Sequence, residues 1–165
     1  MSINLETEFR DADHNKIILK DIINHIEDEI LSHPEIEYKL SIGTDSMTCK
    51  DTLFVLAIVL YRVGRGGIYY YKKINHSHIS DLRTKLYDET KLSLDTADIF
   101  IDSILKEDNN LLDKLNFSIH LDIGKNGPTK DLIRELEGWV TSMGYDYAIK
   151  PDSYAATTIA NMHSK

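Results

Sequence analysis

The feature that most constrains the fold is the segment of residues 52–61, which is almost entirely apolar and rich in β-branched side chains. A strand with one face in water alternates apolar and polar residues, so this segment predicts a strand covered on both faces. A glycine-rich turn follows at residues 64–67, and the tyrosine-rich residues 68–74 predict a second strand. The two segments together predict a β-hairpin.

Helical and strand patterns flank this hairpin. Isoleucine recurs at every fourth position from 18 to 30, which is the period of one helix face, and Pro34 ends that helix. The other predicted elements are strands at residues 38–44, 116–122 and 145–149 and helices at residues 80–106, 129–143 and 153–163. The chain is therefore expected to be an α/β protein with five strands, in the order β-β-β-α-β-α-β-α after an extra N-terminal helix.

Length and composition set further limits. The 165 residues fit one domain, which we expect at residues 15–165, with residues 1–14 as a polar, loosely attached arm. The net charge of -8 argues against a protein that coats nucleic acid by bulk electrostatics, but it allows a metal site built from carboxylates. Cys49 is the only cysteine, which excludes an intramolecular disulfide and a thiolate metal cage. No apolar run approaches the roughly 20 residues that span a bilayer, and the N-terminus does not resemble a secretory signal, so we expect a cytoplasmic protein without membrane contact.

Three aspartates lie at the ends of predicted elements. Asp45 closes the strand before the hairpin, Asp122 closes the fourth strand, and Asp152 begins the last helix. Ligands of open α/β sheets bind outside the carboxyl ends of the strands, so parallel neighbouring strands would bring Asp45 and Asp122 side by side. Adjacent carboxylates repel unless a proton or cation lies between them, and such oxygen ligands suit Mg²⁺ or Mn²⁺. Each aspartate alone also fits a turn or helix-capping role, and only their joint occurrence favours a metal site.

Two further residues are candidates for the same site. Glu89 shares a helical stripe with apolar residues, where an ionised carboxylate is costly unless it is paired or bound to metal. Asp88 is the competing candidate, and a position at the helix edge is the ordinary alternative. His120 shares a strand face with Asp122, where it would orient a ligand or move a proton, although a hydrogen-bonded structural histidine fits equally well.

Basic residues gather around the hairpin. Of these, Arg65 and Lys72 are expected to contact substrate phosphates, although a solvated hairpin face is the commoner explanation of such charges. The loop at residues 124–127 lacks the pattern of a phosphate-binding P-loop.

Four short segments of the sequence resemble a known protein family. They are Ile42-Gly43-Thr44-Asp45-Ser46, Gly64-Arg65-Gly66-Gly67, His120-Leu121-Asp122-Ile123-Gly124 and Lys150-Pro151-Asp152-Ser153-Tyr154-Ala155-Ala156. Together they resemble the uncharacterised bacterial YkuK-type family, which is grouped with the ribonuclease H-like superfamily. The resemblance covers nearly everything from about residue 15 to the end, and it implies a ribonuclease H-like mixed sheet flanked by helices.

The resemblance also implies a chemistry, the hydrolysis of phosphodiester bonds with two Mg²⁺ or Mn²⁺ ions. Carried over by position, the acids that hold the ions are Asp45, Glu89, Asp122 and Asp152. His120 would assist proton transfer or orient Asp122. On this basis we interpret the chain as a metal-dependent nuclease that acts on RNA or DNA.

Two other functions stay open at this stage. The first is a non-catalytic ribonuclease H-like module that binds a nucleic acid or a protein partner, which the acidic balance of the chain favours. The second is a nucleotide-dependent phosphotransferase of a distantly related fold group, although no glycine-rich phosphate loop supports it. Metal binding separates the nuclease from the binding module, and stabilisation by nucleotides would single out the phosphotransferase.

Overall fold

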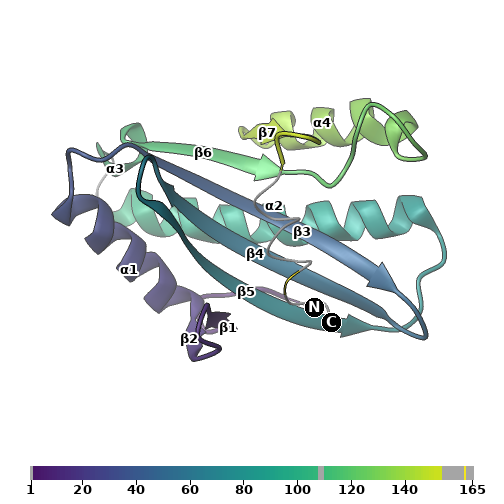
Figure 1. Ribbon diagram of the computed structural model, residues 1–165, viewed down its shortest axis with the longest axis horizontal. Helices are drawn as coiled ribbons and strands as arrows, with labels where there is room; N and C mark the ends of the chain where they lie inside the picture. The colour runs from purple at the N-terminus through teal and green to yellow at the C-terminus, as the bar shows by residue number, and fades with distance from the viewer. Residues whose placement is uncertain (1, 108–109, 154–161, 163–165) are drawn as a thin grey trace.

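Seven strands form one mixed sheet in the computed structural model, which describes residues 2–107, 110–153 and 162 (Figure 1). Across the sheet the order is β2-β1-β5-β4-β3-β6-β7. The strands are β1 (Glu8–Asp11), β2 (Lys16–Ile18), β3 (Tyr38–Thr48), β4 (Thr52–Arg62), β5 (Gly66–His76), β6 (Leu115–His120) and β7 (Asp146–Ala148). The β3–β6 and β6–β7 pairs are parallel, and the other pairs are antiparallel.

The helices gather on one face of this sheet. They are α1 (Leu19–Ser32), α2 (Leu82–Glu107), α3 (Asn110–Asp113) and α4 (Ile133–Ser142), the last preceded by a 3₁₀ turn, η1 (Lys130–Leu132). The long α2 runs along the sheet, with α1 at one side and α4 at the other (Figure 1). Among the described helices, none has both the length and the apolar character needed to cross a lipid bilayer.

The central strand β4 is buried on both faces, as its composition predicts. Leu56 and Ile58 belong to the main core, which α1, α2 and α4 complete. Val55 and Ala57 belong to a smaller apolar cluster on the opposite face. The hairpin is also confirmed, because β4 pairs with β5 along its whole length. Its turn needs glycine, since Gly64 and Gly66 have φ angles of 81° and 82°, a region that strains residues with a Cβ.

The expected five-stranded sheet and element order do not match the structure, because β1 and β2 add two strands and α3 and η1 add short helical turns. The expectation of a loosely attached arm at residues 1–14 is corrected as well. β1 pairs with β5, and Ile3 and Phe9 are buried in the main core. β1 has only four residues, too few for a clear alternation of apolar and polar side chains, so the sequence pattern did not predict it. The predicted helix at residues 153–163 lies almost entirely outside the described residues.

Replacing Phe9 tests whether the N-terminal strands belong to the core. Phe9 is 1% exposed, so Phe9→Ala should lower the free energy of unfolding by about 3–5 kcal/mol, as cavities left by buried phenylalanines do. The matched control is Leu5→Ala, because Leu5 is 38% exposed and should lose far less. Urea denaturation measures both values, and equal losses in the two variants would contradict the burial of β1.

Candidate metal centre

The register between β3 and β6 brings Asp45 and Asp122 together. Parallel pairing ends at Gly43 opposite His120, where β6 stops, while β3 continues to Thr48. Asp45 and Asp122 each lie two residues beyond this last pair. The sequence placed both residues at strand ends, and the structure corrects this: Asp45 lies within β3, and Asp122 lies in the segment that follows β6.

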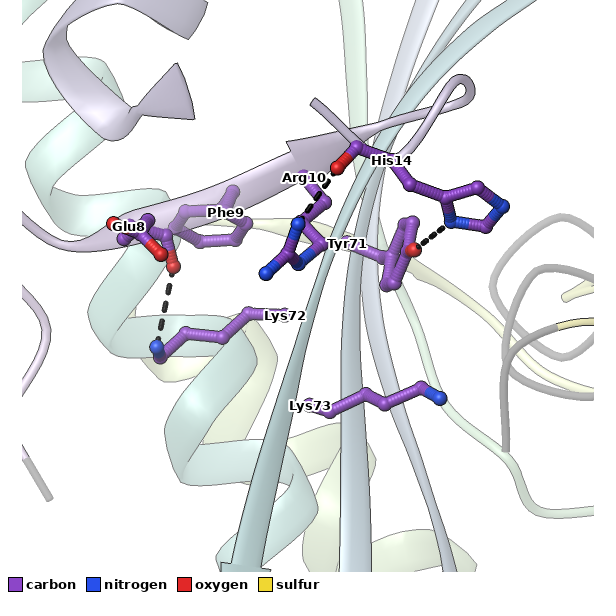
Figure 2. Close-up of a pocket in the computed structure, with 7 residues that line it drawn as sticks. All are labelled: Glu8, Phe9, Arg10, His14, Tyr71, Lys72 and Lys73. Carbon is purple, nitrogen blue, oxygen red and sulfur yellow. Dashed lines mark hydrogen bonds between the residues drawn. The ribbon is translucent and has the colours of Figure 1, made fainter. Parts of the chain in front are cut away.

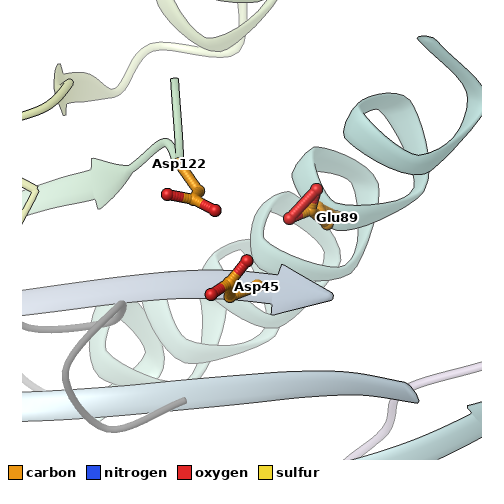
Figure 3. A group of neighbouring side chains, drawn as sticks. All are labelled: Asp45, Glu89 and Asp122. Carbon is orange, nitrogen blue, oxygen red and sulfur yellow. The ribbon is translucent and has the colours of Figure 1, made fainter. Parts of the chain in front are cut away.

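Helix α2 supplies the third carboxylate. Ser93, one helical turn after Glu89, shares a hydrogen bond of 2.8 Å between its Oγ and Thr44 Oγ1 on β3. This contact holds α2 against β3 at the level of the two aspartates, and Glu89 points at them (Figure 3). Carboxylate oxygens of Asp45, Glu89 and Asp122, one from each residue, all lie within 4.8 Å of one another. The competing Asp88 lines a different cavity, beside β4 and β5.

The three residues, which we call the acidic triad, perturb one another strongly. Glu89 is only 6% exposed, and burial together with the nearby Asp45 and Asp122 raises its pKa well above the usual value. Burial, a hydrogen bond shared with Asp122 and repulsion from Asp122 raise the pKa of Asp45 to about 7. Near neutral pH the triad therefore favours either a bound proton or a bound cation.

Lys150 is a member of the site that the sequence reasoning missed. The last residue pair between β6 and β7 is His120 with Ala148. Asp122 and Lys150 each lie two residues beyond this pair, on neighbouring segments. Lys150 Nζ lies 2.8 Å from Asp122 Oδ1 in an ion pair, and the pKa of Lys150 is raised chiefly by its interaction with Asp122. The signal was present in the sequence as a lysine two residues after a strand, but it becomes meaningful only once the β6–β7 register is known.

His120 lies behind the triad in a small cavity. The cavity is lined by Glu89, Thr90 and Ser93 of α2 and by Leu136 of α4, among others. Burial lowers the pKa of His120 to about 4, so its imidazole is neutral at pH 7. The expected position near Asp122 is therefore observed, and the buried ring lies beside Glu89 as well.

Three of the predicted site residues lie apart from the triad. Asp152 is exposed in the turn after Lys150 and is not part of the converging group, so the expected set of four acids becomes three. Arg65 lies in the β4–β5 turn, close to Tyr38, the first residue of β3. At about 3.3 Å per residue, Tyr38 is roughly 23 Å along the strand from Asp45. Lys72 lies on β5 in another pocket.

Comparison with known proteins agrees with this geometry. A family model described as "Ribonuclease H-like" matches residues 21–165. The chain belongs to the ribonuclease H-like family. A protein of Bacillus subtilis (strain 168), "Uncharacterized protein YkuK", is 39% identical over 168 residues, which cover 95% of this chain and 96% of that protein. The resemblance to the YkuK-type family is thereby confirmed, and no solved structure matches the chain.

The pH dependence of stability tests the electrostatics of this ribonuclease H-like site. Because folded Asp45 binds its proton more tightly than the unfolded chain does, protonation stabilises the fold at low pH. That stabilisation is lost as the pH rises from about 4 to about 7. Melting temperatures measured in EDTA should fall over this interval, and Asp45→Asn should flatten the fall. Asp88→Asn is the control and should keep it, and an identical pH profile in all three proteins would contradict the coupling.

Divalent ions should relieve the same repulsion. Millimolar Mn²⁺ or Mg²⁺ should raise the melting temperature, because a ligand that binds only the folded state stabilises it. Asp45→Asn and Glu89→Gln should each remove this increment, and Asp152→Asn should retain it, because Asp152 is exposed and apart from the triad. An increment that survives in Asp45→Asn would contradict a metal centre at these residues.

Proposed function

We propose that this chain is a metal-dependent nuclease that hydrolyses phosphodiester bonds of RNA or DNA. The observation that carries the proposal is the convergence of three carboxylates within 4.8 Å at the end of the β3–β6 pairing. Membership of the ribonuclease H-like family supports it. A fold alone does not define an activity, so the argument rests on the acidic triad.

The triad fits two Mg²⁺ or Mn²⁺ ions. All three side chains offer carboxylate oxygens, the ligands that these ions prefer. Burial and neighbouring negative charge raise the pKa values of Glu89 and Asp45, and a bound cation would offset that repulsion. Asp45, Glu89 and Asp122 would hold the ions. Bound ions of this kind supply Lewis acidity to a phosphodiester group and to the attacking water.

Neighbouring residues would position the triad and admit the substrate. Lys150 restrains the Asp122 carboxylate through their ion pair. The neutral His120 would orient Glu89 or take up a proton from their common cavity. An open cavity of about 650 Å³ adjoins Lys150, and Asp152 lines it, so Asp152 would act at the substrate entrance rather than as a ligand in the triad.

A non-catalytic binding module is the second candidate function. The observation that favours it is the Lys150–Asp122 ion pair, because an internal cation already neutralises one of the three acids. In that case the triad would hold the end of the sheet together, and the nucleic acid would be bound without hydrolysis.

A cleavage assay separates the two functions. Purified protein with Mn²⁺ is incubated with hybrid, duplex, single-stranded and branched substrates, and cleavage is expected for at least one of them. Asp45→Asn and Asp122→Asn should each reduce the rate by at least about a hundredfold, since metal-ion stabilisation is worth several kcal/mol and each 1.36 kcal/mol is a factor of ten. Asp146→Asn, an exposed residue of β7, is the control for the loss of one negative charge.

Two results would overturn the nuclease. Absence of cleavage in a preparation that binds Mn²⁺ would favour the binding module. Undiminished cleavage in both Asp45→Asn and Asp122→Asn would place the activity at another site.

A further inference from the structure

A basic pocket lies at the outer edge of β5, beside the start of β1 (Figure 2). It has a volume of about 440 Å³, within the range of small-ligand sites, and its basic residues are Arg10, His14, Lys72 and Lys73. β1 pairs with β5 only at Tyr70 and Tyr71, so in the described chain the edge of β5 from Lys72 onward has no neighbouring strand. The start of β1 pairs with β2 and not with β5, which leaves a recess in which side chains of both β1 and β5 meet.

Three cations of this basic pocket form no ion pair within the described part of the chain. Among the described residues, Arg10, Lys72 and Lys73 form no ion pair. Glu8 is the one carboxylate that lines the pocket, and it lies 4.0 Å from Lys16 instead. The whole chain has 27 acidic and 19 basic residues, so a cluster of three cations that form no ion pair within the described residues is not explained by composition. It is suited to an anion supplied from outside.

Hydrogen bonds to the main chain hold these side chains in place. Arg10 Nη1 donates to the carbonyl oxygen of His14 at 2.7 Å, and Lys72 Nζ donates to the carbonyl oxygen of Glu8 at 3.1 Å. His14 Nδ1 and the Tyr71 hydroxyl are 2.6 Å apart (Figure 2). Less side-chain freedom is then lost when a ligand binds, which favours affinity.

The strand register links the basic pocket to the acidic triad. Asp45 pairs with Val55, and Val55 pairs with Lys73, so the three backbone positions lie in one row across the sheet, with the buried Val55 between the other two. Two strand spacings of about 4.8 Å separate the backbones of Asp45 and Lys73 by roughly 10 Å. The basic pocket and the triad therefore lie at the same level of the sheet.

We propose that the basic pocket binds a backbone phosphate of the nucleic acid on which the triad acts. The substrate class rests on the proposed function. Arg10 and His14 precede the segment that the ribonuclease H-like model matches, whereas Lys72 and Lys73 lie within it. Lys72 was expected from the sequence to contact phosphate, and Arg10 is a new assignment.

Binding measured without cleavage tests the proposal. In EDTA, the fluorescence anisotropy of labelled single-stranded RNA and of an RNA–DNA hybrid reports affinity at several salt concentrations. Lys73→Gln should weaken binding at least fivefold and reduce the slope of log K against log salt by about one. The double variant Arg10→Gln/Lys73→Gln should reduce that slope by about two. Arg65→Gln removes an exposed charge at the far end of the hairpin, and its affinity should be unchanged.

Several results would overturn this assignment. One is unchanged affinity in Lys73→Gln, which tests the pocket even if the Arg10 variant fails to fold. Another is an equal loss in Arg65→Gln, which would indicate general electrostatic attraction. Inorganic phosphate and a mononucleotide serve as competitors, and tight binding of either without binding of the oligonucleotides would mean a small-anion site. Cleavage by the unaltered chain is measured separately. If the chain cleaves but Lys73→Gln binds nucleic acid with unchanged affinity, the pocket is rejected and the nuclease is retained. If Lys73→Gln weakens binding but the unaltered chain does not cleave, the nuclease is rejected and the pocket is retained.

Discussion

The early end of the parallel pairing between β3 and β6 is the constraint on which the rest of the site depends. If β6 continued beside β3, main-chain pairing would occupy the position where Asp45, Glu89 and Asp122 converge. Because β6 stops at His120, α2 reaches the uncovered part of β3 and brings a carboxylate to it. This arrangement has an electrostatic cost, since burial and the neighbouring acids make Asp45 and Glu89 hold their protons far more tightly than free carboxylates do.

The sequence reveals those parts of the molecule whose signals are local. The apolar run of β4 and the helical stripe that includes Glu89 repeat over many residues, so the hairpin and the helical carboxylate were predictable. Lys150 and Arg10 depend on pairings between distant segments, β7 with β6 and β1 with β5, which no local period encodes. The distance of Arg65 from the triad was hidden for the opposite reason, because its closeness to Lys72 along the chain conceals the length of the strands between the turn and the triad.

Under the proposed function, the charge of the chain would match a polyanionic ligand at two separate points. An overall charge of -8 disfavours non-specific adhesion to nucleic acid, and so any binding must come from local clusters. The basic pocket is such a cluster, and the triad is another once cations neutralise it. Weak overall attraction combined with defined contacts favours selection of a particular nucleic-acid geometry over indiscriminate binding.

The hydrogen bond between Thr44 and Ser93 has a consequence for the choice of ion. It ties α2 to β3, so Glu89 and Asp45 are carried by elements that cannot easily shift relative to each other. Asp122 follows the end of a strand and is held by a lysine side chain, which makes it the adjustable ligand. Two fixed ligands and one compliant ligand can adapt to cations of different radius, so the centre should accept Mg²⁺ and Mn²⁺ in exchange and discriminate between them only weakly.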